Sequence, residues 1–165
     1  MKLSRAVVGG LIGGVAVMAI VWLGGWASGN DGDLSALLGA VITHDDGLLA
    51  WTIGCVVQLV VAVVAAIVYA AIFEWVARRG GAIVGLVVAV GHVVVAGLAV
   101  GFLPVDGIVA AGLQPPAAFM EYRGLWVLAG FVVAHLVFGV IVGATYGPTV
   151  RRPSESAADW REAAR

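Results

Sequence analysis

Three polar side chains stand alone inside long apolar stretches of this sequence, and their types are suited to chemistry. Gln58, His92 and His135 each lie in a different stretch, flanked by hydrocarbon side chains and glycines. Imidazole nitrogens bind metals and haem iron and carry protons near neutral pH, and a carboxamide both donates and accepts hydrogen bonds. What these residues can do depends on the elements that bring them together.

The apolar stretches have the length of membrane-spanning helices. The chain of 165 residues is 62% hydrophobic and 12% charged, whereas a soluble domain is typically about 45–50% apolar and about 25% charged. A helix needs about 20 residues to cross a bilayer, and residues 6–27, 48–77, 81–103 and 124–146 are long enough. Lipid favours helices because they satisfy their own backbone groups. We therefore predict an all-α, polytopic membrane protein, a four-helix transmembrane bundle.

The ends of the chain fit this organisation. The first stretch exceeds the apolar core of a signal peptide, which is about 7–15 residues, so we predict that it is retained as a span. Residues 1–150 then form the bundle, and residues 151–165 form a short cytoplasmic tail. A capping-box pattern from Ser156 to Asp159 predicts a surface helix in the tail, with Trp160 as its membrane anchor.

Basic residues predict the orientation. Of the nine Lys and Arg residues, only Arg123 lies in the first or third loop. By the positive-inside rule, both termini and the turn between spans two and three are therefore cytoplasmic. That turn is short, so spans two and three form an antiparallel hairpin. Five tryptophans near span ends are predicted membrane-interface anchors: Trp22, Trp26, Trp51, Trp75 and Trp126.

Small residues share a helix face with each polar residue. On span four, His135 is followed by Gly139, Gly143 and Gly147 at intervals of four, and span three places Gly85 on the face of His92. Membrane helices approach closely along such ridges, so we assign these four glycines to helix packing.

The other two spans carry similar patterns. On span two the stripe is Gly54, Gln58, Ala62, Ala65, Ala66 and Tyr69. On span one, the doublets Gly9-Gly10 and Gly13-Gly14 either close the bundle or bind another chain.

Gln58, His92 and His135 therefore face protein in one layer, and three interpretations compete. In the first, they form hydrogen bonds between helices and fix the packing, each bond contributing about 0.6 kcal/mol. In the second, His92 and His135 bind b-type haem or a metal. Close glycine packing leaves little room for a porphyrin, and a third metal ligand is not obvious in the sequence. In the third, the histidines form a proton or ion path that Glu74 extends, although Glu74 also has the spacing for an ion pair with Arg78.

Catalytic and nucleic-acid signatures are missing from the sequence. There is no Walker loop, nucleophile elbow, HExxH or CxxC motif. The net charge of −1 gives no reason to expect nucleic acid as a partner.

The features in order resemble an uncharacterised family of small four-helix bacterial membrane proteins. The resemblance rests on a glycine-rich first span, GAIVGLVVAVGHVVVAGLAVGFLP, and the terminal HLVFGVIVGATYG. Where relatives carry a histidine on the second span, this chain has Gln58, which weakens a three-histidine metal site. The resemblance implies the fold and supplies no activity.

We therefore predict a non-enzymatic integral protein of the bacterial cytoplasmic membrane without a bound cofactor. Its predicted partners are the lipid bilayer and other membrane subunits or copies of itself. The preferred role is an accessory or scaffolding subunit of a larger assembly, and the alternative is haem or metal binding or proton transfer through the histidines.

Overall fold

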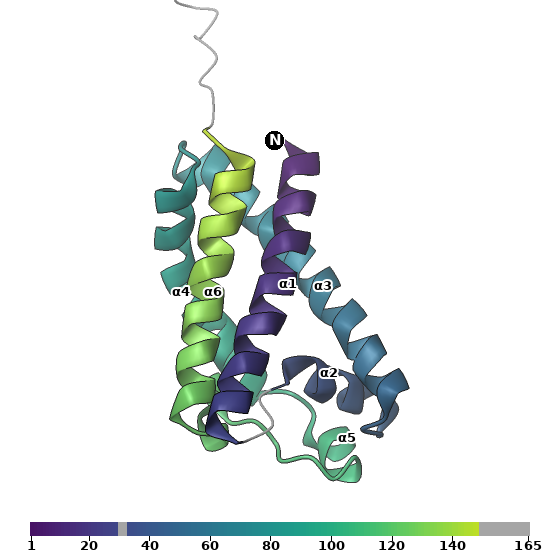
Figure 1. The fold of residues 1–165 in the computed structure, drawn as a ribbon. Helices are drawn as coiled ribbons and strands as arrows, with labels where there is room; N and C mark the ends of the chain where they lie inside the picture. Colours follow the sequence, from purple (N-terminus) through teal and green to yellow (C-terminus); the bar gives the residue numbers. More distant parts are fainter. Residues whose placement is uncertain (30–32, 149–165) are drawn as a thin grey trace, which may run out of the picture.

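The computed structural model describes residues 1–29 and 33–148. Within them, four helices are long and apolar enough to cross a membrane. They are α1 (Leu3–Ser28), α3 (Leu48–Ala71), α4 (Ala82–Gly101) and α6 (Leu125–Tyr146), with α3 continued by a π-helical turn, η1 (Ile72–Val76) (Figure 1). The predicted all-α bundle is confirmed, and the helix bounds agree closely with the predicted spans.

The beginning of α1 and the end of α6 lie at the same end of the bundle (Figure 1). We call this the terminal end, and the opposite end, where α2 and α5 lie, the loop end. The Lys2 backbone N–H donates to the Tyr146 hydroxyl at 3.0 Å, which joins the start of α1 to the end of α6. The predicted tail at residues 151–165, with its surface helix and Trp160, lies outside the described residues.

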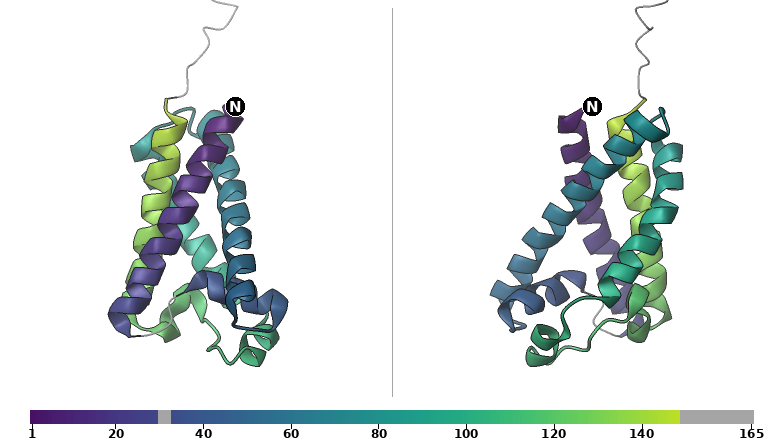
Figure 2. Two further views of the ribbon diagram at one scale, coloured as in Figure 1. Left: turned by 45° about the vertical axis from the view of Figure 1, so that its right-hand side comes forward. Right: turned by 180° about the vertical axis from the view of Figure 1, so that it is seen from behind.

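Helix α1 occupies the centre of the arrangement, between α3 and α6, and α4 packs on α6 (Figure 2). Gly10 and Gly14 of α1 lie against α3, whereas Gly9 and Gly13 lie against α6. A Cβ on Gly10 would lie 2.8 Å from a backbone carbon of α3, and one on Gly13 would lie 2.6 Å from a ring carbon of Phe138. Of the two predicted roles for these glycine doublets, they perform the first, closing the bundle.

Helices α3 and α4 run antiparallel from the short turn at residues 77–81, as predicted. They diverge with distance from that turn, so they do not pack along their length (Figure 2). The hairpin prediction is therefore correct in direction and incomplete in packing. The divergence separates the two helices toward the loop end.

A further helix, α2 (Leu34–Thr43), lies at the loop end and was not predicted. The Asp33 carboxylate caps it, with Oδ1 accepting from the backbone N–H groups of Ser35 at 2.8 Å and Ala36 at 3.3 Å. The helix packs closely on α3, because a Cβ on Gly54 would collide with the carbonyl oxygen of Ser35. With ten residues it is too short to span a bilayer, and it packs mainly on α3.

The last loop contains α5 (Val105–Ala110) and the 3₁₀ segment η2 (Ala118–Arg123). Between them lies a helix-free stretch around Pro115 and Pro116, as the two prolines require. An Arg123 guanidinium nitrogen donates to the carbonyl oxygen of Gln114 at 2.5 Å, which holds this loop to the start of α6.

Candidate functional site

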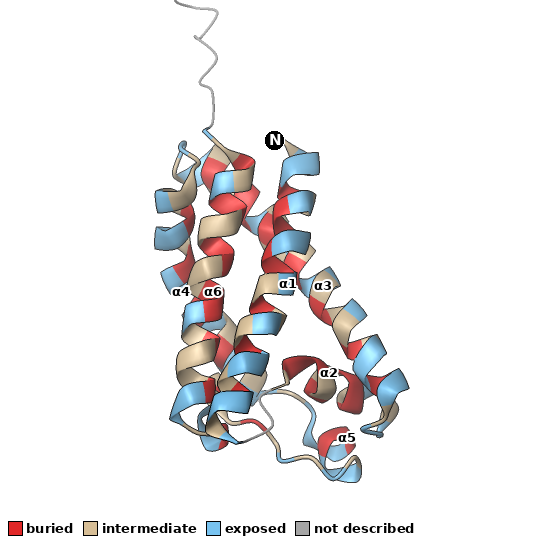
Figure 3. Ribbon diagram, viewed as in Figure 1, coloured by how far each residue is buried: buried red, intermediate tan, exposed pale blue. Residues whose placement is uncertain are grey.

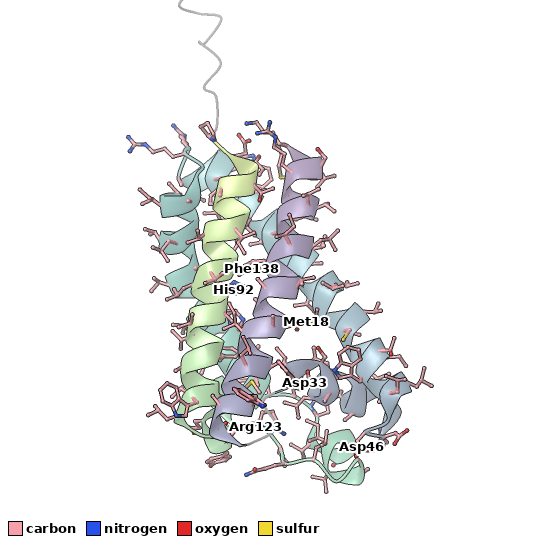
Figure 4. All side chains as sticks on the ribbon, in the orientation of Figure 1. Met18, Asp33, Asp46, His92, Arg123 and Phe138 are labelled. Carbon is pink, nitrogen blue, oxygen red and sulfur yellow. The ribbon has the colours of Figure 1, made fainter. Side chains whose placement is uncertain are left out.

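A cavity of about 250 Å³ lies between α3 and α4, with α1, α2 and α6 contributing to its walls. Gln58, His92 and His135 all line it, and every other lining residue is apolar. His92 lies beside Phe138 near the middle of the bundle (Figure 4). The three polar residues that the sequence placed in one layer therefore share one cavity.

Gln58 extends from α3 into this cavity. Its side chain is 7% exposed, and its carboxamide makes no hydrogen bond to any residue that the structure describes. Neither of its polar atoms is enclosed by protein, so the carboxamide is open to the cavity. Polar groups enclosed by protein are almost always paired, whereas the Gln58 carboxamide faces the cavity and has no partner among the described residues.

His92 is held from α4 by a residue of α3. The Tyr69 hydroxyl lies 3.2 Å from His92 Nδ1, and the two rings meet edge to face with centroids 5.6 Å apart. This contact joins α3 to α4 near the point where the helices begin to diverge. It leaves Nε2 of His92 without a protein partner among the described residues.

His135 is fixed by its own helix. Its Nδ1 lies 2.8 Å from the carbonyl oxygen of Phe131, one turn earlier, and its ring packs on the Phe131 ring with centroids 4.2 Å apart. The side chain is 6% exposed. Its ring contacts that of His92 edge to face at 5.1 Å between centroids, so the two histidines meet across α4 and α6 as predicted.

The pattern of hydrogen bonds corrects the first interpretation from the sequence. That interpretation expected Gln58 and both histidines to bond between helices. Only His92 does so, through Tyr69, while His135 bonds within α6 and Gln58 bonds to no described residue. The polar layer therefore lines a cavity between the diverging helices α3 and α4, with only His92 and His135 in ring contact.

The geometry of the two rings bears on haem and metal binding. A haem held by both histidines would place its porphyrin plane between them, yet the rings are in direct edge-to-face contact. This arrangement does not fit haem ligation by the pair. No group of three or more His, Cys, Asp or Glu side chains is placed to hold a metal ion within residues 1–29 and 33–148.

Glu74 belongs to a separate cluster at the terminal end. Its carboxylate accepts a hydrogen bond from the Tyr146 hydroxyl at 2.5 Å, and the Tyr146 carbonyl oxygen accepts from Arg5 at 3.4 Å. The spacing that suited an ion pair of Glu74 with Arg78 assumed a continuous helix, but the π turn η1 ends at Val76, and Arg78 has a left-handed backbone with φ of 51°. Helical spacing therefore does not extend from Glu74 to Arg78.

The four predicted packing glycines all lie at or near the α4–α6 contact. A Cβ on Gly85 would collide with the carbonyl oxygen of Gly139, and a Cβ on Gly143 would collide with that of Gly81. Gly147 follows α6 and lies beside the turn before α4, with φ of 73°. The glycine ridges therefore pack helices of this chain against one another.

The five predicted tryptophan anchors have side chains that are between 45% and 75% exposed. Trp75 lies at the terminal end, and the others lie toward the loop end: Trp22, Trp26, Trp51 and Trp126. Trp51 Nε1 donates to Asp33 Oδ2 at 2.6 Å, which ties the start of α3 to the cap of α2. Exposed residues also cover the outward face of α4 (Figure 3). Together, the tryptophans and apolar outer faces are suited to contact with a lipid bilayer.

Several residues of the site were not predicted from the sequence. Tyr69 was placed on the same stripe of α3 as Gln58 but was not assigned to the polar cluster. Leu34 and Leu38, which line the cavity from α2, were not predicted either. The sequence contains a signal for the tyrosine, whereas the leucines depend on how an outer-loop helix packs.

Comparisons of the chain with protein-family models, curated proteins and solved structures gave no match. The resemblance to small four-helix bacterial membrane proteins therefore stays a prediction.

Proposed function

We propose that this chain is a non-enzymatic membrane protein that binds a small amphiphilic molecule in the cavity between α3 and α4. The polar end of the ligand contacts Gln58, His92 and His135, and its apolar part contacts the hydrocarbon walls. The observation that carries the proposal is Gln58, which is 7% exposed, lines the cavity and has no partner among the described residues. A buried polar group without a partner costs about 1–3 kcal/mol, and a bound polar group removes this cost.

The size and position of the cavity support this role. An engineered apolar cavity of about 150 Å³ binds benzene, so about 250 Å³ accommodates a molecule of two fused rings. Val61 of α3, which is 53% exposed, and Ala99 of α4, also exposed, belong to the cavity lining. A ligand dissolved in the membrane can therefore enter between α3 and α4 without passing through water.

The proposed setting is a bacterial cytoplasmic membrane with both termini on the cytoplasmic side. Clustering of Lys and Arg at the terminal end supports this orientation through the positive-inside rule.

An accessory or scaffolding subunit, the role preferred from the sequence, remains a second proposal. Helix α4 favours it, because a smaller share of its apolar 18-residue core is buried inside the chain than in the other spans. The share is 22% for α4 and 33–39% for the other three. However, lipid can cover the exposed face of α4 as well as a protein can. The glycine ridges already pack against other helices of the same chain. A membrane protein that co-purifies with this chain in a fixed ratio would support this role.

Binding is tested with small aromatic probes and a variant that fills the cavity. Purified full-length protein in nanodiscs is dialysed to equilibrium with 2-naphthol or 2-acetylnaphthalene, and empty nanodiscs correct for partition into lipid. We expect saturable binding of at least one probe. Ala96→Phe places a ring in the cavity and should abolish binding, whereas Val95→Phe on the exposed face of α4 should not. If neither probe binds the wild type saturably, or if Ala96→Phe binds them as the wild type does, the proposed function is wrong.

A further inference from the structure

The hydrogen-bonding groups of the cavity select the kind of polar group that fits it, and His135 gives the first constraint. A carbonyl oxygen only accepts, so the Nδ1 that lies 2.8 Å from the Phe131 carbonyl carries the proton. The His135 side chain is 6% exposed, and no Asp, Glu, Lys or Arg side chain lines the cavity. An isolated charge is costly in apolar surroundings. The neutral form of the imidazole is therefore favoured. A neutral ring with its proton on Nδ1 presents Nε2 as an acceptor.

His92 has the opposite arrangement. The Tyr69 hydroxyl has Nδ1 of His92, at 3.2 Å, as its hydrogen-bond partner. A buried hydroxyl proton needs an acceptor, so Tyr69 donates and Nδ1 of His92 is bare. The proton of the neutral ring is then on Nε2, which becomes a donor. Although the two rings touch, no hydrogen bond joins them.

The cavity therefore offers three unused sets of groups: an acceptor on His135, a donor on His92 and the carboxamide of Gln58, which does both. A hydroxyl group carries one donor and two acceptor sites, and it is the smallest group that matches this set. A carbonyl, ether or ester oxygen only accepts and would leave Nε2 of His135 without a partner.

We infer that the cavity binds a hydrophobic alcohol or phenol, whose hydroxyl group donates to Nε2 of His135 and accepts from His92 and Gln58. This inference rests on the proposed function and names the ligand class of the same site. The remaining walls, including Val17, Leu38 and Phe131, are apolar and offer no hydrogen-bonding side chain, so the ligand carries no second polar group.

The first test compares probes of similar size that differ in their polar group. The probes are 2-naphthol, 2-methoxynaphthalene, 2-acetylnaphthalene and naphthalene, each dialysed against the full chain in nanodiscs. A site built to bond a hydroxyl rejects analogues that lack the donor, so we expect 2-naphthol to bind about tenfold or more tightly than each of the others. Equal affinity for 2-naphthol and 2-methoxynaphthalene would overturn the hydroxyl inference while leaving the cavity as a binding site. Absence of saturable binding by every probe would instead overturn the proposed function.

The second test needs no substitution and cannot fail through misfolding. In protein labelled with ¹⁵N at histidine, NMR distinguishes protonated from bare imidazole nitrogens. We expect His135 to be protonated on Nδ1 and His92 on Nε2, and 2-naphthol to shift Nε2 of His135 more than its Nδ1. The inference is wrong if His135 carries its proton on Nε2, or if bound 2-naphthol leaves that nitrogen unchanged. His44, an exposed histidine in the loop after α2, serves as the internal control and should not respond.

Discussion

Gln58 is the residue at which the competing interpretations of the polar layer make opposite predictions. A carboxamide that bonds between helices stabilises the bundle, whereas a carboxamide kept for a ligand costs stability when the ligand is absent. The side chain is 7% exposed, and no described residue bonds to it. Its neighbour on the same stripe, Tyr69, does bond across helices, to His92. The two positions therefore provide a matched comparison on one helix.

We expect Gln58→Leu to leave the free energy of unfolding unchanged or to raise it by about 1–3 kcal/mol, because it removes a buried polar group that has no protein partner. Tyr69→Phe should instead lower the free energy of unfolding by about 0.6 kcal/mol, since it removes one interhelical hydrogen bond. Reversible unfolding in mixed micelles, in the absence of added ligand, measures both. If Gln58→Leu lowers stability as Tyr69→Phe does, then Gln58 is an interhelical contact.

At the scale of the elements, the contact of α4 with α6 depends on an absence of side chains. Gly85 and Gly139 face each other so closely that a Cβ on either would collide with the carbonyl oxygen of the other. Gly91 lies on the same helix as Gly85 but has open space around the position of a Cβ. Helix propensity alone favours alanine over glycine at both positions. Packing therefore decides whether each substitution lowers or raises the free energy of unfolding.

Gly85→Ala should lower the free energy of unfolding by about 1–3 kcal/mol, because overpacking forces the two backbones apart. Gly91→Ala should raise it by about 0.5–1 kcal/mol, because alanine restricts the unfolded chain and meets no neighbour in the folded one. The same unfolding assay measures both variants. Equal effects of the two substitutions would contradict the close α4–α6 contact.

At the scale of the whole molecule, the start of α1 and the end of α6 lie at the terminal end, and α2 and α5 lie at the loop end (Figures 1 and 2). Four of the five exposed tryptophans named above also lie toward the loop end. The proposed orientation in the membrane is inferred from the placement of basic residues. Exposed residues at each end allow this orientation to be measured. Ser4 marks the terminal end, and Asp46 marks the loop end (Figure 4).

In a Cys55→Ser background, we expect a membrane-impermeant maleimide to label Asp46→Cys in intact bacterial cells. Ser4→Cys should react only after the cells are lysed, because positive residues retain the terminal end in the cytoplasm. Replacing Cys55 removes the single native thiol, which is partly buried in α3. The reverse labelling pattern would show that the orientation is inverted and that basic residues do not set it here.

The sequence by itself determined the number of spans, their bounds and the common level of Gln58, His92 and His135. These properties are local: hydrophobic length sets a span, and the helical rise sets depth within it. It also identified Gly85 and Gly139 as packing residues, since close approach requires small side chains at helical spacing.

Only the tertiary structure decided what lies between the polar residues. Helices α3 and α4 diverge, and α2 packs at the loop end, so the layer encloses a cavity where interhelical hydrogen bonds were expected. The angle between two helices depends on all the elements packed around them. It cannot be inferred from the spacing of residues along one helix. For the same reason, the pairing of Glu74 with Tyr146, which are 72 residues apart, could not be predicted from the sequence around either residue.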